Sequence, residues 1–242
     1  KKLIEKKNLK NLIQEIKNGI IQGINITVPF KNDIYEILME DANSNVSTAV
    51  ANTKSVNTVN LDKYGKLFGD NTDVKGFKKG LQNLDYTVNG KTALVLGAGG
   101  VVPSILEALN ILNIKSVAIS NRTKEKAEEI QRELGEQFRI QEVVEWGRDP
   151  KIFDPDIIIN CTSLGLKKDD QLVFDIKKHK SKLFYDVIYN PPITNFLKEA
   201  KKNGNKTENG KMMFIYQACE AFKIWHGIQP KIDDEVIKLL DL

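Results

Sequence analysis

The chain predicts an α/β protein of two domains, the larger of which is a Rossmann-type doubly wound parallel sheet. From about residue 91 onward, short apolar strands alternate with amphipathic helices, which is the pattern of repeated strand–helix–strand units. A glycine-rich turn at residues 97–100 directly follows one of those strands, as in nucleotide-binding sheets. The pattern before residue 73 is different, so we expect a second, smaller domain at the start of the chain.

Apolar spacing and turn residues predict the elements of the first part. Apolar residues recur at helical spacing between Leu9 and Ile16, and Gly19 offers a place for that helix to end. Pro29 turns the chain and favours the start of the next helix. In chain order we expect a helix at 1–17, a strand at 20–27, a helix after Pro29, strands at 54–60 and 66–69, and a helix at 74–84.

The second part alternates more regularly. After Thr92, the run at 92–96 is apolar, which is typical of a strand buried on both faces of a parallel sheet. We expect further strands at 116–120, 156–160 and 183–187, with helices at 105–112 and 124–134, one ending at 198–202, and two more at 212–225 and 233–240. The connections between parallel strands are expected to be right-handed.

The turn after the strand at 92–96 has the composition of a phosphate-binding loop. Its glycines would let backbone N–H groups approach a pyrophosphate at the start of the next helix. The loop residues are Gly97, Ala98, Gly99 and Gly100. The third glycine of the usual fingerprint is missing, because Val102 stands there. The position of the loop between a strand and a helix, more than its glycine content, therefore favours a dinucleotide.

The end of the next strand indicates NADP(H) rather than NAD(H). Enzymes that use NAD usually have an acidic residue there for the ribose hydroxyls. This chain instead has Arg122, whose guanidinium is suited to a 2′-phosphate, and Lys124 adds a second positive charge. The plainer interpretation is a helix start with Thr123 as N-cap, and the two interpretations are compatible.

The composition favours a protein that acts on a small molecule. The net charge is +4, but the lysines are scattered and form no basic stripe, so we expect no nucleic-acid partner. No stretch is long and apolar enough to span a membrane, and we expect a cytoplasmic protein, either monomeric or homodimeric. Cys161 and Cys219 are expected to be unpaired thiols, and no residue spacing suggests a metal site.

Three polar clusters on apolar flanks mark a candidate pocket in the first domain, at residues 25–31, 55–58 and 69–73. Burying such groups costs free energy unless something pairs them, and a bound polyol would do so. Taken alone, Lys31 is more often a surface lysine, and Asp73 more often an N-cap for the helix at 74. Their joint occurrence with the other polar residues favours a site.

Eight segments of the chain carry a family resemblance. They are residues 25–31 (NITVPFK), 56–58 (VNT), 69–73 (GDNTD), 97–100 (GAGG), 121–123 (NRT), 160–165 (NCTSLG), 185–189 (YDVIY) and 217–222 (QACEAF), the last leading to WHG at 225–227. In these segments the sequence resembles the shikimate dehydrogenase family, NADP-dependent enzymes of aromatic amino-acid biosynthesis. Two departures stand out: no serine-x-serine motif precedes Asn25, and the glycine loop continues Val101-Val102-Pro103.

The resemblance implies the residues of the site. It implies a catalytic pair, Lys31 and Asp73, and no metal. The implied substrate contacts are Thr27, Asn57, Asp73, Tyr189 and Gln217. The implied NADP(H) contacts are Gly97, Ala98, Gly99, Gly100, Val101, Asn121, Arg122, Thr123, Val187 and Gly210. It also implies a discontinuous substrate domain, residues 1–73 and 211–242, and an NADP-binding domain, residues 74–210.

The residues themselves suit reduction of a ketone. When a carbonyl carbon accepts a hydride, its oxygen gains negative charge and needs a cation or a proton donor, which Lys31 can supply. Taken with this chemistry, the family resemblance implies reversible reduction of 3-dehydroshikimate to shikimate with NADPH. Two alternatives stay open from the sequence: a quinate or quinate/shikimate dehydrogenase, and a non-catalytic NADP-binding regulatory homologue.

Overall fold

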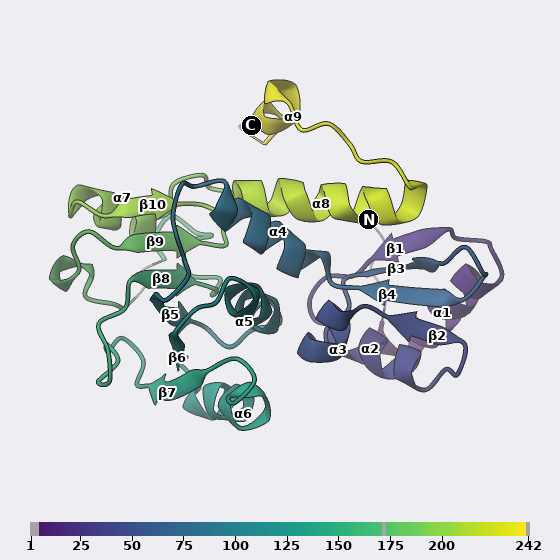
Figure 1. The fold of residues 1–242 in the computed structure, drawn as a ribbon, viewed down its shortest axis with the longest axis horizontal. Helices are drawn as coiled ribbons and strands as arrows, with labels where there is room; N and C mark the ends of the chain where they lie inside the picture. Colours follow the sequence, from purple (N-terminus) through teal and green to yellow (C-terminus); the bar gives the residue numbers. More distant parts are fainter. Residues whose placement is uncertain (1–4, 171–172, 241–242) are drawn as a thin grey trace.

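The computed structural model describes residues 5–170 and 173–240, and within them it has two sheets, each with its own core (Figure 1). The smaller sheet has the order β1-β3-β4-β2. Its strands are β1 (Gly23–Asn25), β2 (Ser44–Val46), β3 (Thr58–Leu61) and β4 (Leu67–Asp70). β3 pairs antiparallel with β1 and β4, whereas β2 pairs parallel with β4, so this sheet is mixed.

Short helices cover the small sheet and bury their apolar faces against it. They are η1 (Lys6–Asn8), α1 (Leu9–Lys17), α2 (Lys31–Met39) and α3 (Thr48–Thr53). Ile16 of α1, Ile34 of α2 and Val50 of α3 are fully buried in one cluster with Val59 of β3. The helical spacing that predicts α1 is therefore the spacing of residues that face this core.

The larger sheet is parallel throughout and has the order β10-β9-β8-β5-β6-β7. Its strands are β5 (Thr92–Leu96), β6 (Ser116–Ser120), β7 (Ile140–Val144), β8 (Ile157–Asn160), β9 (Leu183–Asp186) and β10 (Lys206–Glu208). The helices beside it are α5 (Val102–Ile111), α6 (Lys124–Leu134) and α7 (Asn195–Lys202), with the short η2 (Ile176–Lys178). This is the doubly wound order of a Rossmann sheet, so the predicted fold class is confirmed.

Two long helices join the sheets. In Figure 1, α4 (Thr72–Gln82) and α8 (Lys211–His226) lie side by side across the middle of the molecule, and α9 (Asp234–Lys238) lies above α8. α4 begins two residues after β4 of the small sheet, and its Phe77 and Leu81 are buried in the core of the large domain. α8 leaves the large sheet after β10 and brings Trp225 to within contact of Gly23 in β1.

The predicted elements match the structure unevenly. The strands at 92–96 and 116–120 and the helix at 124–134 have the predicted bounds. The strand expected at 20–27 is only Gly23–Asn25, because β1 is an edge strand that pairs with β3 over three residues. β2, α3, β7 and β10 were not predicted, and all four are short or lie at a sheet edge.

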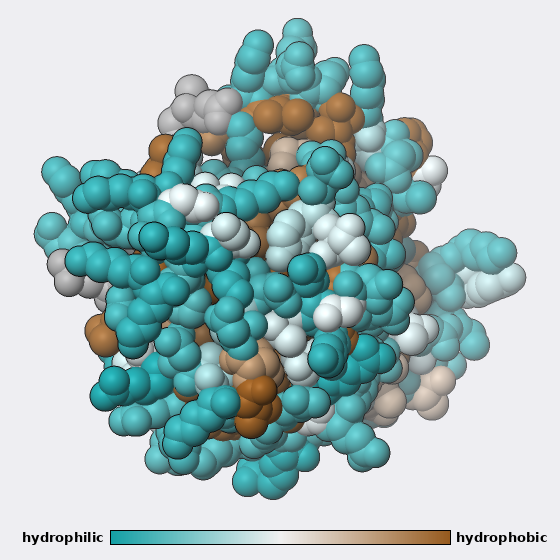
Figure 2. Space-filling view, turned by 60° about the vertical axis from the view of Figure 1, so that its left-hand side comes forward, coloured by the Kyte–Doolittle hydropathy of each residue, from teal (hydrophilic) through white to brown (hydrophobic). Residues whose placement is uncertain are grey.

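Figure 2 shows hydrophilic residues over most of the face that it presents, with hydrophobic residues gathered near the top, at the level of α9. Among the described residues, no helix has both the length and the apolar character needed to cross a bilayer.

Candidate active site and nucleotide site

A cavity of about 290 Å³ opens at the carboxyl ends of β5, β6, β7 and β8. β5 and β8 are neighbours at the point where the strand order reverses, which is where such sheets bind nucleotides. The cavity is lined by Gly97, Ala98, Gly99, Asn121, Arg122, Thr123, Lys126, Trp146, Cys161, Thr162, Ser163 and Leu164. Six of the ten residues predicted for the cofactor are in this list.

The glycine loop has the geometry that a pyrophosphate requires. Gly97 has a φ of +116°, and a Cβ there would lie 3.1 Å from the carbonyl oxygen of Cys161. Glycine therefore allows the turn after β5 to pass close to the turn after β8. A Cβ on Gly99 or Gly100 would meet nothing within 4 Å, so this part of the loop has open space before the first turn of α5. The loop thus fits a dinucleotide phosphate at a helix N-terminus.

The positive charges at this cavity differ from those predicted. Arg122 lines it, but the second basic residue is Lys126 rather than Lys124. Lys124 forms an ion pair with Glu128 one turn further along α6, at 2.9 Å. Thr123 is at the N-cap position but its side chain makes no capping hydrogen bond. Arg122, which follows β6, and Lys126, in α6, can therefore both approach a phosphate in this cavity.

Some predicted cofactor residues lie elsewhere. Gly100 and Val101 are not among the residues that line the cavity, and Val101 packs against the core of the large domain. Asn121 lines it, and its side-chain amide donates a hydrogen bond of 2.7 Å to the Thr123 carbonyl, which fixes the turn after β6. Trp146 lines the cavity and also packs against the core beneath the sheet.

A second cavity, of about 560 Å³, lies between the two sheets. It is lined by Asn25, Ile26, Thr27, Lys31, Asn57, Asp73, Val187, Tyr189, Gly210, Met213, Phe214, Gln217 and Ala218. Every predicted catalytic and substrate-binding residue is in this list, together with Val187 and Gly210 that were predicted for the nicotinamide end of the cofactor. The small sheet supplies one wall, and the turn after β9 with the first turns of α8 supplies the other.

Lys31 and Asp73 form a buried ion pair in the wall of this cavity. The Lys31 ammonium donates a hydrogen bond to Asp73 Oδ2, and the two residues are 7% and 8% exposed. Asp73 does not cap α4, because that helix already begins at Thr72. Its carboxylate sits in the first turn of α4, where the helix dipole favours a negative charge. A buried lysine without this partner would be strongly destabilising, so each group holds the other in place.

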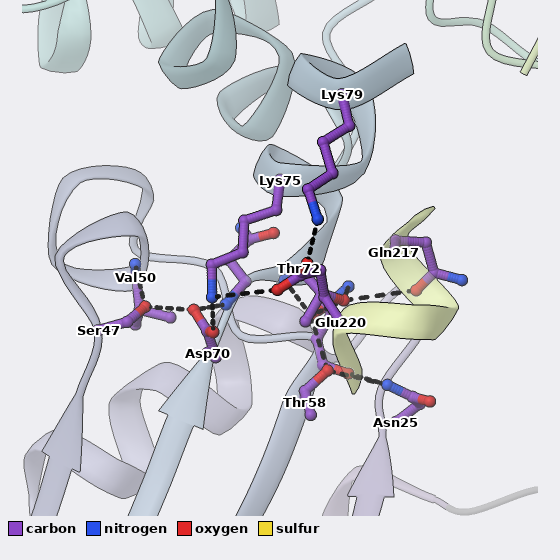
Figure 3. Close-up of polar contacts among 12 residues, drawn as sticks. Asn25, Ser47, Val50, Thr58, Asp70, Thr72, Lys75, Lys79, Gln217 and Glu220 are labelled. Atoms are coloured by element: carbon purple, nitrogen blue, oxygen red, sulfur yellow. Dashed lines mark hydrogen bonds and ion pairs between the residues drawn. The ribbon is translucent and has the colours of Figure 1, made fainter. Parts of the chain in front are cut away.

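Each residue of the segment 70–73 is fixed by a different part of the protein. The Asp70 carboxylate accepts hydrogen bonds from Ser47 Oγ at 2.5 Å and Lys75 Nζ at 2.7 Å, as Figure 3 shows. Lys75 lies 4.0 Å from Glu220 of α8, and Lys79 also pairs with Glu220. A line of charges therefore connects the end of β4 to both central helices.

Asn71 ties the same segment to the large domain. Its side chain is fully buried, and its amide donates hydrogen bonds to Thr53 Oγ1 at 3.2 Å and Ser104 Oγ at 2.9 Å. Ser104 belongs to α5, the helix that follows the glycine loop. The turn that carries Asp73 is thus held against the nucleotide-binding helix.

Thr72 connects two of the predicted substrate residues. Its backbone N–H donates to Asn57 Oδ1 at 2.8 Å, and its hydroxyl accepts from Asn57 Nδ2 at 3.0 Å. The same hydroxyl lies 3.4 Å from Gln217 Oε1 of α8 (Figure 3). Thr72 was not predicted for the site, because a threonine between a strand and a helix is typical of a helix start.

Asp186 and Cys161 lie at the carboxyl ends of β9 and β8, close to both cavities. Burial raises the pKa of the Asp186 carboxyl to about 6, although hydrogen bonds from Thr194, Ile188 and Asn160 oppose the shift. Burial, followed by the nearby Asp186 charge, raises the pKa of the Cys161 thiol above its usual range. Cys161 is therefore a neutral, buried thiol, and both cysteines are free, as expected from the sequence.

Lys126, Met213 and Phe214 also line the cavities and were not predicted. Lys126 could have been found from the helix that starts at 124, where its position near the N-terminus follows from the 3.6-residue period. Met213 and Phe214 gave no such signal, since apolar residues on α8 are equally typical of a core. Among residues 5–170 and 173–240, no group of three or more histidine, cysteine, aspartate or glutamate side chains is arranged to hold a metal ion.

Comparison with known proteins identifies relatives along the whole chain. Residues 79–202 match the family model described as shikimate / quinate 5-dehydrogenase, and residues 213–234 match the shikimate 5'-dehydrogenase C-terminal domain. The shikimate dehydrogenase (NADP(+)) of Pelagibacter ubique is 47% identical over 243 residues, covering 100% of this chain and 87% of the relative.

Solved structures agree with the sequence relatives. A crystal structure of shikimate dehydrogenase in complex with NADP+ has a TM-score of 0.84 and 36% identity, covering 98% of this chain and 81% of that one. Shikimate dehydrogenase from Aquifex aeolicus has a TM-score of 0.81 and 34% identity, covering 98% of this chain and 84% of that one. The chain therefore belongs to the shikimate/quinate 5-dehydrogenase family.

Proposed function

We propose that this chain catalyses the reversible NADP(H)-dependent interconversion of 3-dehydroshikimate and shikimate, a step of aromatic amino-acid biosynthesis. The observation that carries the proposal is the buried Lys31–Asp73 pair in the wall of a 560 Å³ cavity that also contains Asn57 and Gln217. The names of the relatives, shikimate dehydrogenase (NADP(+)), support the substrate and the cofactor.

NADPH, when bound, supplies the hydride. The residues that would hold it are the glycine loop at the start of α5, with Arg122 and Lys126 for the 2′-phosphate. Val187 and Gly210 line the larger cavity, and the Gly210 N–H donates to the Ile188 carbonyl at 3.1 Å, so the turn after β9 and the start of α8 stay together. These contacts support a nicotinamide-binding wall opposite the small sheet.

Lys31 is the proposed proton donor to the carbonyl oxygen in the direction of reduction. Its ammonium has two further N–H groups beyond the one used on Asp73, and its residue lines the cavity. Asp73 keeps the ammonium charged and directed, which stabilises negative charge that develops on a substrate oxygen. In the direction of oxidation, the same pair accepts the proton from the alcohol.

The neutral polar residues are proposed to select the substrate by its hydroxyl groups. Thr27, Asn57, Tyr189 and Gln217 surround the same cavity and offer hydrogen bonds from four different segments. A site built this way discriminates strongly against an analogue that lacks a hydroxyl, because its own buried polar groups are then left unpaired. The intact ion pair favours a catalytic protein over a non-catalytic regulatory homologue. A comparison of oxidation rates on shikimate and on quinate separates a shikimate dehydrogenase from a quinate dehydrogenase.

We also place the reaction in the cytoplasm, which two buried, unpaired thiols support. The proposed partner is a small molecule.

Replacement of Lys31 by methionine tests the proposal directly. We expect kcat for NADP+-dependent shikimate oxidation to fall about 10²–10⁴-fold, because the proton donor and acceptor is lost, while NADP+ binding is retained. The matched control is Lys17→Met, since Lys17 also pairs with an aspartate, Asp41, at 2.5 Å but lines neither cavity. Near-normal turnover of Lys31→Met would contradict the proposed role.

A further inference from the structure

The hydrogen bonds around Thr72 determine which way the two amides of the larger cavity face. Asn57 and Thr72 are 3% and 0% exposed, so their polar atoms must find partners within the protein. Asn57 Oδ1 can accept two hydrogen bonds. The Thr72 N–H, at 2.8 Å, and the Thr58 hydroxyl, at 3.0 Å, provide both.

The orientation of the Asn57 amide follows from this arrangement. A backbone N–H can only donate, so the atom 2.8 Å from the Thr72 nitrogen must be the oxygen of the amide. Asn57 Nδ2 is then the atom that donates to Thr72 Oγ1 at 3.0 Å. The Thr58 hydroxyl is directed consistently, because it accepts from Asn25 Nδ2 at 2.9 Å and so has its hydrogen free for Asn57. One N–H of Asn57 remains available at the cavity.

The orientation of the Gln217 amide follows in turn. The Thr72 hydroxyl accepts from Asn57 Nδ2 at 3.0 Å and lies 3.2 Å from Asn57 Oδ1 and 3.4 Å from Gln217 Oε1. Because Asn57 Oδ1 already accepts from the Thr72 N–H and the Thr58 hydroxyl, the hydrogen of the Thr72 hydroxyl is assigned to Gln217 Oε1. Figure 3 shows the Gln217 amide oxygen on the side of Thr72 and the amide nitrogen on the far side. Gln217 therefore presents its NH₂ group to the cavity that it lines.

We infer that Thr72 is a positioning residue that makes both Asn57 and Gln217 hydrogen-bond donors toward the ligand. With the Lys31 ammonium, three donors then face one cavity, from the residue before β3, from α8 and from α2, and they select ligand oxygens that accept hydrogen bonds. The inference rests on the proposed function for its ligand, a cyclic polyol carboxylate, but the amide orientations are a property of the free protein.

The test compares Thr72→Val, Thr72→Ser and the wild type in NADP+-dependent shikimate oxidation. Valine removes the hydroxyl at nearly constant volume, so Asn57 Nδ2 loses its acceptor and Gln217 loses its donor. We expect KM for shikimate to rise roughly tenfold, with kcat and KM for NADP+ within about threefold, because the lost contacts bind substrate and transition state alike. Serine keeps the hydroxyl and restores KM to within about threefold of the wild type.

The matched control is Thr92→Val. Thr92 is also a buried threonine, and its hydroxyl contacts Asp154 O at 3.1 Å, Asp156 Oδ2 at 3.2 Å and the Asp156 backbone nitrogen at 3.2 Å. It lies at the start of β5 and lines neither cavity. It should lose stability without a change in KM. An unchanged KM for shikimate in Thr72→Val, or an equal change in Thr92→Val, would overturn the inference. If Thr72→Val does not fold, Thr72→Ala removes the same hydroxyl and is judged by the same values.

A second measurement separates this inference from the proposed function. Side-chain NH₂ resonances of Asn57 and Gln217 in the protein without ligand report the two amide environments by NMR. We expect both to shift in Thr72→Val and neither to shift in Thr92→Val. Absence of shikimate oxidation in the wild type would refute the proposed function alone, whereas unshifted amide signals would refute the role of Thr72 alone.

Discussion

Substitution of Gly76 by alanine is expected to disturb the active site from outside it. Gly76 lies in α4 at the closest approach to α8, where a Cβ would stand 2.6 Å from the Met213 carbonyl oxygen and 2.8 Å from Gln217 Cβ. Ordinary van der Waals contact begins near 3.4 Å, so α8 must move by roughly 0.8 Å to admit the methyl group. Neither contact involves the flexible end of a side chain, so rotation of a side chain does not relieve the clash.

The magnitude follows from two opposing effects. Alanine in place of glycine within a helix favours the helix by about 1 kcal/mol. Overpacking between two rigid helices costs about 1–3 kcal/mol. We therefore expect a net loss of about 1 kcal/mol in the free energy of unfolding. The larger effect is on the site, because Gln217 Oε1 is already 3.4 Å from the Thr72 hydroxyl and a further shift breaks that contact.

Gly80 provides the matched control one helical turn further along α4. A Cβ there would lie 3.4 Å from the Tyr185 hydroxyl and 3.5 Å from Met213 N, which are ordinary contacts. Gly80→Ala should therefore be neutral or stabilising by up to about 1 kcal/mol. Urea unfolding gives the stability of both variants, and shikimate oxidation gives KM, which we expect to rise roughly fivefold or more in Gly76→Ala alone. Equal stability and equal KM in the two variants would refute the packing argument.

Two further predictions concern the nucleotide cavity and pH. Arg122→Asp should raise KM for NADP+ about 10–100-fold, since a charge-assisted contact is lost and a repulsive one is gained. The control, Lys124→Ala, should change this KM less than about twofold. An unchanged KM in Arg122→Asp contradicts the assignment of Arg122 to the 2′-phosphate. The pKa of Asp186, raised by burial from 3.8 to about 6, means that the unfolded chain ionises first as pH rises. Stability from this group is therefore full below about pH 4 and falls by at most about 3 kcal/mol up to pH 6. Asp186→Asn should remove that decline in denaturation curves measured between pH 4 and 7, and an identical pH profile for both proteins would count against it.

The nucleotide-binding half was predictable because its elements are long and locally encoded. The strands Thr92–Leu96 and Ser116–Ser120 have apolar centres, ALVL and VAI, and Lys124–Leu134 has a clear helical period. β10 is only Lys206–Glu208, a polar edge strand that exists through its pairing with β9. Such a strand depends on tertiary context, so the sequence alone carries little signal for it.

The site was predictable in part. Lys31 and Asp73 are 42 residues apart, and no local pattern shows that they meet; the family resemblance supplied the pair, and the structure brings the two side chains together. Thr72 was missed because its role depends on Asn57 and Gln217, which approach it from other elements. The spacing of residues along the sequence does not predict which residues orient others, because their partners are defined only by the fold.

The bridging position of α8 has a consequence for synthesis of the chain. Lys31 and Asp73 are translated first, but the cavity wall formed by Met213 and Gln217 is not made until α8 has been synthesised. Trp225, which closes against Gly23 of β1, comes later still. A nascent chain on the ribosome therefore has both charged groups of the ion pair without the enclosure around them, and ligand binding is reserved for the completed protein.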